Sequence, residues 1–228
     1  MDSLPRLRAV IFDLDGTLVN CPYDFTAMRQ AVIEIGRRFG IAEEELAGLG
    51  VLEAIEAGEK LLGPTTGKRF REEAEERVLA LELAGAADSA PLPGVRETLA
   101  WLCQEGLRVG IITRNSAKVV GNLLRRAELQ YDALLTREAV ARVKPHPGHL
   151  QTMLARLECS SNEAVMVGDH IWDMTCGKEA GLICVGMATG AASKEALYEA
   201  GAEEVLEDMG HLPEWLKERF CLSGGKFS

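Results

Sequence analysis

The sequence predicts an α/β fold, and three observations support this prediction. Short continuous apolar runs recur along most of the 228-residue chain, and such runs are typical of strands buried on both faces of a parallel sheet. Helical patterns lie between these runs. One stretch, residues 20–88, interrupts the alternation because it offers helix-like segments and no convincing strand. We therefore predict a Rossmann-like core, an open parallel sheet with helices on both faces, into which an α-helical domain is inserted.

The first apolar run, Arg8–Phe12, ends abruptly at Asp13 and predicts the first strand of the core. Similar runs predict four further strands, the last of them weaker: Val109–Ile112, Ala164–Val167, Ile183–Val185 and Val205–Leu206. A shorter apolar patch lies at Ala133–Leu135. The predicted core helices are Gly94–Gln104, Ser116–Ala127, His149–Leu157, Trp172–Ala180 and Ser193–Ala200.

The inserted stretch begins with a predicted helix that Asp24 caps and Gly40 ends. Its second helical segment, about Glu43–Leu62, contains three glycines, so we expect it to be broken or bent. Pro91–Gly94 then marks the return to the alternating pattern. The predicted domains are therefore an insert and a core in two segments: residues 20–88, then 1–19 and 89–228.

The composition is that of a globular protein, with 47% hydrophobic and 26% charged residues and a formal net charge of −10. Nucleic-acid polymers and anionic membranes both require a positive field, so we expect neither as a partner. No apolar stretch approaches the roughly 20 residues of a membrane span, and the first residues lack the apolar core of a signal peptide. We therefore expect a cytoplasmic protein whose six cysteines are reduced and mostly placed in the core.

Polar side chains follow the predicted strands at the points where the strands end, which is where open α/β sheets bind their ligands. These side chains are Asp13 and Asp15 after the first strand, Thr113, Arg114 and Asn115 after the second, Lys144 at the end of the segment that contains the patch Ala133–Leu135, and Asp169 and Asp173 after Ala164–Val167. Each feature alone has an ordinary explanation, such as a turn, a cap or a solvated lysine. Their joint placement at one sheet edge favours a functional site.

The residue types at this edge suit phosphoryl chemistry. Carboxylates gathered in one crevice repel each other unless a cation neutralises them, and an all-oxygen set selects a hard ion such as Mg²⁺. Asp13 and Asp15, one residue apart, can divide the roles of nucleophile and proton donor. Gly16 permits a turn in which backbone N–H groups point at an anion. The side-chain donors for a phosphoryl group are then Thr113, Asn115 and Lys144.

In their order along the chain these residues resemble the four motifs of the haloacid dehalogenase superfamily of phosphohydrolases, over about residues 8–207. The matching segments are Asp13-x-Asp15-Gly16-Thr17-Leu18, Thr113 after an apolar strand, Lys144-Pro145, and Gly168-Asp169-x-x-x-Asp173. The insert lies between the first two motifs, and in this it is similar to the small α-helical cap of phosphoglycolate-phosphatase-like members.

The resemblance implies an Mg²⁺-dependent phosphatase that hydrolyses a small phosphate monoester through an aspartyl-phosphate. Asp13 would attack phosphorus, and Asp15 would protonate the leaving oxygen and later activate water. The implied Mg²⁺ ligands are the Asp13 carboxylate, the Asp15 backbone carbonyl, Asp169 and Asp173, the last directly, through water, or as a residue that orients Lys144. Thr113 and Lys144 would bind the phosphoryl oxygens, and the remaining substrate-binding candidates are Gly16, Thr17, Arg114 and Asn115.

The expected partner is a small phosphorylated metabolite, with phosphoglycolate or a sugar phosphate as the expected substrate, acted on by a monomer or homodimer. The polar residues of the insert that are candidates for substrate contact are Tyr23, Asp24, Arg29, Lys60, Lys68 and Arg69. A phosphomutase keeps the same residues and stays the enzymatic alternative. A receiver-like signalling module is disfavoured, because in such a module a separate acidic pair precedes the phosphorylated Asp and the domain is about half this length. A non-catalytic binding protein is disfavoured because the motif set is complete.

Other residues near the motifs receive no role in the expected reaction. His146 and His149 have a spacing that zinc sites use, but no third ligand lies near them in sequence. His170 is expected to face substrate or solvent, and Trp172 to pack under the loop that carries Asp169. Cys21 has no neighbour in sequence that would activate its thiol.

Overall fold

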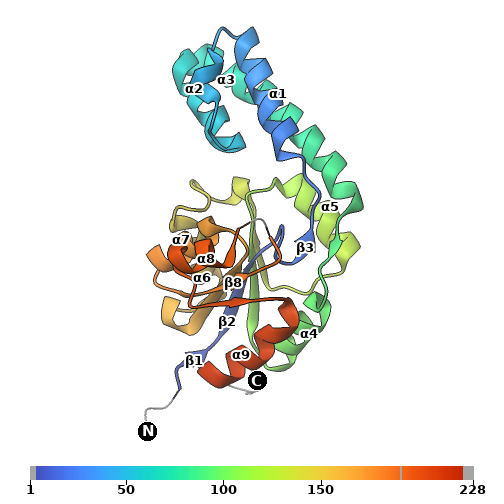
Figure 1. Ribbon diagram of the computed structural model, residues 1–228, viewed down its shortest axis with the longest axis vertical. Coiled ribbons are helices and arrows are strands. Elements are labelled where there is room, and N and C mark those ends of the chain that lie inside the picture. Colours follow the sequence, from blue (N-terminus) through green and yellow to red (C-terminus); the bar gives the residue numbers. More distant parts are fainter. Residues whose placement is uncertain (1–3, 191, 223–228) are drawn as a thin grey trace. The chain divides into compact units, whose positions relative to one another are not determined.

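The computed structural model describes residues 4–190 and 192–222 (Figure 1). Their contacts divide the chain into two compact units. The core unit consists of the residues up to Cys21 together with those from Ala90 onward, and the helical unit is Pro22–Ser89. The predicted insert, residues 20–88, differs from the helical unit by two residues at its start and one at its end.

A parallel sheet forms the centre of the core unit. Its six described strands are β2 (Ala9–Asp13), β5 (Arg108–Ile112), β6 (Ala133–Leu135), β7 (Ala164–Gly168), β8 (Ile183–Met187) and β9 (Glu204–Leu206). They lie in the order β6-β5-β2-β7-β8-β9, and every neighbouring pair is parallel. The predicted fold class is therefore confirmed, and the apolar patch at 133–135 forms the edge strand next to β5. Because β2 lies between β5 and β7, the side chains that follow these three strands are brought to one place.

Helices join the strands of the sheet. They are α4 (Val95–Gln104), α5 (Ala117–Ala127), α6 (Gly148–Leu157), α7 (Ile171–Glu179), α8 (Lys194–Ala200) and α9 (Leu212–Arg219). Three 3₁₀ turns, η2 (Arg137–Ala139), η3 (Ser161–Glu163) and η4 (Met209–His211), lie in the connections. The first five helices start and end within a residue of their predicted bounds. Helix α9, whose Trp215 and Leu216 are buried, was not predicted from the sequence.

Two short ribbons complete the core unit. One pairs β1 (Arg6–Leu7) with β10 (Cys221–Leu222) in parallel, and the other pairs β3 (Val19–Asn20) with β4 (Ala90–Pro91) in antiparallel fashion. The second ribbon directly follows the Asp13–Thr17 loop. It therefore joins the loop after β2 to the chain that leads into α4.

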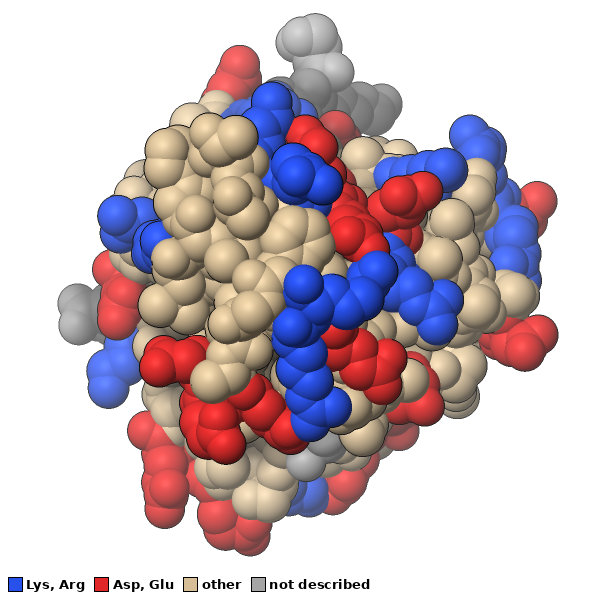
Figure 2. All heavy atoms as spheres, turned by 90° about the horizontal axis from the view of Figure 1, so that it is seen from above, with Lys and Arg blue, Asp and Glu red and all other residues tan. Residues whose placement is uncertain are grey.

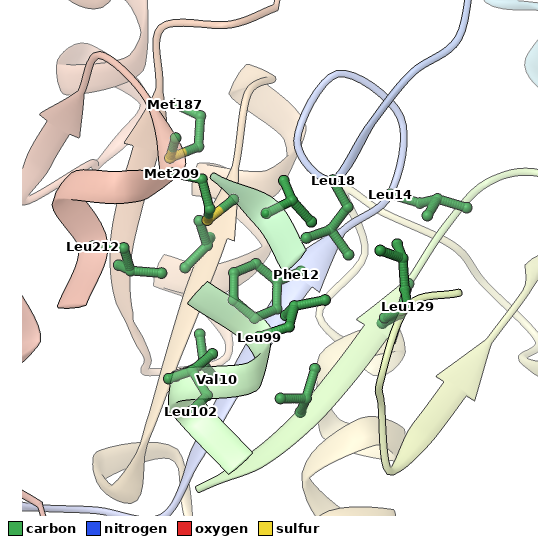
Figure 3. Packing of buried hydrophobic residues seen from close by; sticks show 14 of the residues in the cluster. Val10, Phe12, Leu14, Leu18, Leu99, Leu102, Leu129, Met187, Met209 and Leu212 are labelled. Carbon is green, nitrogen blue, oxygen red and sulfur yellow. The ribbon is translucent and has the colours of Figure 1, made fainter. Parts of the chain in front are cut away.

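Alternate residues of β2 pack on opposite faces of the sheet, as the period of a strand requires. Val10 and Phe12 belong to a cluster with buried residues of α4, α5 and α9 (Figure 3). Ala9 and Ile11 belong to a second cluster with residues of α6, α7 and α8. All four side chains are fully buried, which explains why β2 is a continuous apolar run.

The helical unit contains α1 (Phe25–Arg38), α2 (Glu43–Leu46), α3 (Val51–Gly85) and the turn η1 (Ala86–Asp88). Asp24 caps α1 as predicted, because its side chain accepts a hydrogen bond from Ala27 N–H at 2.8 Å. The predicted segment Glu43–Leu62 is broken, as its glycines led us to expect, since the chain leaves helical conformation after Leu46 and resumes it at Val51. Gly48, with φ of 83°, lies in this break.

The long helix α3 is two arms rather than one rod. Gly63 has φ of 74°, Pro64 follows it, and Arg71 Nε lies 2.6 Å from Glu59 Oε2 although twelve residues separate them. A straight helix would hold such residues about 18 Å apart, so the chain reverses at Gly63. Phe70 and Ile55, one from each arm, share a buried cluster with α1.

Several surface charges of the helical unit form ion pairs. Arg37 with Glu43, Arg38 with Glu73 and Lys60 with Glu56 are three of its ion pairs, and acidic and basic side chains lie interspersed on the face shown in Figure 2. Residues 20–88 hold 14 acidic and 8 basic side chains, so this stretch is acidic overall.

The six cysteines are free thiols. Only Cys176 and Cys184 are buried, whereas Cys103 and Cys221 are exposed, so the predicted core position is right for two of the six and wrong for the exposed pair. Among the described helices, none is both long enough and apolar enough to span a membrane.

Candidate active site

Three carboxylates meet at the carboxyl ends of β2 and β7. Asp13 is the last residue of β2, Asp169 follows β7, and Asp173 lies in the first turn of α7. One oxygen atom of each lies within 4.8 Å of the others, and all three residues are buried. The strand order places these acids together, as the strand-end pattern of the sequence predicts.

Lys144 lies between two of these carboxylates and is 3% exposed. Its Nζ is 2.7 Å from Asp13 Oδ1 and 2.5 Å from Asp173 Oδ1. Burial alone would lower the pKa of this amine, but the charges and hydrogen bonds of the two aspartates raise it above its ordinary value. Lys144 is therefore held as a cation.

One ammonium does not neutralise this cluster. Burial, opposed by Lys144 and reinforced by Asp173, raises the pKa of Asp13 to about 6. Burial and the charges of Asp13 and Asp173 raise the pKa of Asp169 to about 8. The cluster thus has room for a further positive charge, and its donors are hard carboxylate oxygens, which fit Mg²⁺.

Asp15 lies beside the cluster and points elsewhere. Its Oδ2 accepts hydrogen bonds from Thr113 Oγ1 at 3.1 Å and from Asn115 Nδ2 at 2.8 Å. The buried Oδ1 has no hydrogen-bond partner among the described residues. Burial, followed by the charge of Asp13, raises the pKa of Asp15 to about 6, and a hydrogen bond from the Cys21 thiol to this carboxyl group opposes the rise. One oxygen of this carboxyl group is therefore fixed, and the other can carry a proton near neutral pH.

Asp169 is fixed by its neighbours on several sides. The Thr17 hydroxyl donates to Asp169 Oδ1 at 2.7 Å. A Cβ atom on Gly16 or on Gly190 would lie closer than 3.0 Å to Asp169 Oδ2, so only glycine fits at both positions without displacing the carboxylate. The Thr189 hydroxyl donates to Gly16 O at 2.6 Å and joins the loop after β8 to the loop after β2.

The residues predicted to contact substrate have partners within the protein. Gly16 has φ of 83°, as the expected turn requires, but its N–H donates to Val19 O at 2.8 Å. The Thr17 hydroxyl is bonded to Asp169, and Asn115 Nδ2 to Asp15. Their assignment to substrate binding stays a prediction.

Sequence reasoning missed three residues of this site. Thr189 and Gly190 follow the predicted strand Ile183–Val185, so the strand-end rule applied to that strand would have found them. Cys21 reaches Asp15 because an isolated bridge between Asp15 and Val19 folds the chain back beside the loop. No local pattern in the sequence indicates this contact.

The two histidines with zinc-like spacing have structural partners. His149 is fully buried; its Nδ1 accepts from Lys144 N–H at 3.4 Å, and its Nε2 is 3.3 Å from Leu135 O. His146 Nδ1 accepts from Gly148 N–H at 3.0 Å. Both rings accept hydrogen bonds from backbone N–H groups in and next to the loop that carries Lys144.

The polar candidates of the helical unit are distributed along its helices. Asp24 caps α1, Lys60 pairs with Glu56 at 2.7 Å, and Lys68 Nζ is 3.9 Å from Glu72. Arg29 and Arg69 are exposed, and Tyr23 is half-buried with its ring against Phe25. Contact of these side chains with substrate stays a prediction.

Comparison with known proteins shows which family the chain resembles. Residues 10–187 match the family described as haloacid dehalogenase-like hydrolase. A haloacid dehalogenase-like hydrolase domain-containing protein of Arabidopsis thaliana is 33% identical over 177 residues, which cover 77% of this chain and 69% of that protein. A phosphoglycolate phosphatase of Pseudomonas putida is 28% identical over 214 residues, which cover 91% of this chain and 78% of that protein.

Solved structures share the fold. The crystal structure of a hydrolase from Pseudomonas syringae superposes with a TM-score of 0.74 at 24% identity, over 94% of this chain and 100% of that one. This superposition supports the fold described above.

Proposed function

The chain belongs to the haloacid dehalogenase-like hydrolase family, and on that premise we propose that it is a phosphatase that hydrolyses small phosphate monoesters through an aspartyl-phosphate. The observation that carries the proposal is the contrast between two neighbouring carboxyl groups. Asp13 is paired with the Lys144 ammonium at 2.7 Å, whereas Asp15 has no lysine partner and is held through Oδ2 by the neutral groups of Thr113 and Asn115. Two acids in different environments can divide nucleophile and acid roles.

In the first step an oxygen of Asp13 forms a bond to phosphorus while the bond from phosphorus to the ester oxygen breaks. The leaving oxygen takes the proton of Asp15. Thr113 and Asn115 hold Oδ2 of Asp15, so the proton is carried by Oδ1. The same two hydrogen bonds keep the orientation of the group when it loses the proton and becomes a carboxylate.

In the second step the Asp15 carboxylate takes a proton from water, and the water oxygen attacks phosphorus. The bond between phosphorus and Asp13 breaks, which releases inorganic phosphate and restores the Asp13 carboxylate. The Asp15 carboxyl group is protonated again, so the two steps together consume one water and leave the enzyme unchanged.

Asp13, Asp169 and Asp173, with the Asp15 backbone carbonyl, would hold Mg²⁺. When bound, the ion supplies positive charge that lets Asp13 approach an anionic ester and that offsets charge on the phosphoryl oxygens. Lys144 supplies further positive charge from the protein. Thr113 and Lys144 would bind the phosphoryl oxygens.

The experiment that tests the proposal is hydrolysis of p-nitrophenyl phosphate with Mg²⁺ and after its removal by a chelator. We expect activity that depends on Mg²⁺ in the wild type and a loss of at least about a thousandfold in Asp13→Asn, because the nucleophile is gone. Activity that survives in Asp13→Asn, or that needs no metal, would contradict the mechanism.

A screen of natural esters then addresses the substrate. Phosphoglycolate and hexose phosphates are the expected substrates. Support for phosphoglycolate comes from relatives that are 28% and 29% identical and are named phosphoglycolate phosphatase. Release of inorganic phosphate supports hydrolysis. Conversion of one sugar phosphate isomer into another without release of phosphate would support the mutase alternative instead.

A further inference from the structure

We propose that Arg114 and Trp172 are positioning residues that hold the Lys144 main chain, rather than contacts for the substrate. The proposal rests on the proposed function for the role of Lys144, but the contacts themselves do not depend on it. It differs from the sequence-based prediction, which assigns Arg114 to substrate binding. It also gives a role to Trp172, which the proposed reaction leaves unused.

Arg114 reaches from the loop after β5 to the loop that carries Lys144. Its Nη1 donates to Lys144 O at 3.1 Å, and its guanidinium carbon lies 4.1 Å from the centre of the Trp172 ring. The ring therefore supports the guanidinium from one side through a cation–π contact while the carbonyl of Lys144 accepts from it. Arg114 is half-buried, which strengthens both contacts relative to a fully solvated side chain.

Trp172 is itself fixed to the residues around Asp173. The backbone N–H of Trp172 donates to His170 Nδ1 at 3.1 Å, and the centres of the two rings lie 4.6 Å apart. His170 N–H in turn donates to Asp173 Oδ2 at 3.0 Å. The other oxygen of Asp173 holds Lys144 Nζ.

These contacts form a closed circuit that begins and ends at Lys144. It runs from Nζ to Asp173, through His170 and Trp172 to Arg114, and back to the Lys144 carbonyl. His149 holds the same residue by its N–H. A lysine side chain has four flexible carbons, so its ammonium keeps one position only if both the main chain and the head group are fixed.

The two roles for Arg114 predict different kinetics. A substrate contact would serve only esters with a second anionic group, so its loss would raise KM for those esters alone. A positioning residue acts through Lys144, which every ester requires. Its loss therefore lowers kcat for all of them and leaves KM nearly constant.

The experiment compares Arg114→Gln, Trp172→Leu and Trp172→Phe with the wild type on p-nitrophenyl phosphate and on phosphoglycolate, whose carboxylate is a second anion. We expect kcat to fall by about tenfold to a hundredfold on both esters in Arg114→Gln and Trp172→Leu. Trp172→Phe keeps an aromatic face and should retain most activity. Arg125→Gln is the matched control, because Arg125 is exposed and bonds to Asn122 in α5.

Hydrogen–deuterium exchange of the full chain gives a readout that needs no activity. We expect the peptide that contains the Lys144 amide to exchange faster in Arg114→Gln and Trp172→Leu than in the wild type and Arg125→Gln, with the melting temperature of the variants close to that of the control. This arm also decides the matter if the wild type hydrolyses no ester. Unchanged exchange, or a rise in KM for phosphoglycolate alone with kcat intact, would overturn the proposal.

Discussion

Gly190 shows how little space surrounds Asp169. A methyl group at this position would meet the carboxylate, so the loop after β8 fixes one side of the acidic cluster through the absence of a side chain. Groups behind a metal ligand set its orientation, and their loss commonly weakens metal binding by tenfold to a hundredfold. Gly190 therefore matters to the site although it offers no donor from a side chain.

We predict that Gly190→Ala weakens Mg²⁺ binding by at least about tenfold, because the new methyl displaces Asp169. Isothermal titration of the protein with MgCl₂ measures this directly. Gly121→Ala is the matched control: a Cβ atom there meets nothing within 4 Å, and the change places Ala in α5, which should stabilise the helix without altering Mg²⁺ affinity. Equal affinities in the two variants would contradict the role given to Gly190.

At single positions, the sequence predicts the site where the chemistry is local. Asp13, Thr113 and Asp169 each follow an apolar run directly, so their convergence can be inferred from the parallel sheet alone. Cys21 beside Asp15 could not be predicted in this way, because a bridge outside the main sheet creates the contact. The partner of Thr17 also depends on tertiary structure, since Asp169 lies 152 residues away in the chain.

At the scale of elements, the connection between β6 and α6 fixes the protonation state of a buried histidine. His149, in the first turn of α6, accepts from Lys144 N–H and is bonded to Leu135 O at the end of β6. Both contacts are satisfied at once only by a neutral ring with its proton on Nε2. Burial and the nearby charges of Lys144 and Arg114 lower its pKa to about 4.

This lowered pKa predicts how stability depends on pH. Between pH 6.5 and about 4 the unfolded chain protonates His149 and the folded protein does not, so the unfolded state binds more protons and stability falls as pH falls through this window. The full contribution, of the order of 3 kcal/mol, is present above the ordinary pKa of histidine. Below about pH 4 it is lost.

We predict that His149→Gln is less stable than the wild type at pH 7 and loses less stability between pH 7 and pH 5. Urea unfolding at these two pH values, followed by circular dichroism, measures the difference. His211→Gln is a suitable control, since His211 is exposed and lies 3.2 Å from Asp208. Parallel losses of stability in His149→Gln and the wild type would show that the ring titrates normally.

Element boundaries follow local chemistry closely in the core unit and less closely in the helical unit. Ser116 and Ser193 cap α5 and α8 through their side chains, and both predicted helices begin at these residues. The second predicted helical segment ends at Leu62, directly before Gly63, but a Gly-Pro pair does not reveal whether the chain bends there or turns back. Packing of Ile55 against Phe70 decides it.

At the scale of the whole molecule, the order of elements along the chain predicts the sheet. Parallel strands joined by single helices have few allowed arrangements, and the strand order β6-β5-β2-β7-β8-β9 places the earliest strand at the centre. The net charge of −10 is also divided between parts of the chain. Part of it lies in the acidic helical unit, and part in four aspartates at the sheet edge that a divalent cation would half neutralise: Asp13, Asp15, Asp169 and Asp173.

The central claim is that Asp13 carries the phosphoryl group, and Asp15→Asn offers the most direct test. p-Nitrophenolate leaves without needing a proton, whereas the second step needs Asp15 as a base, so this variant should release about one equivalent of p-nitrophenol and then stall. Mass spectrometry of the stalled enzyme should find the phosphoryl group on the peptide that contains Asp13. Steady turnover by Asp15→Asn with no phosphorylated enzyme, or a phosphoryl group on another residue, would contradict the account.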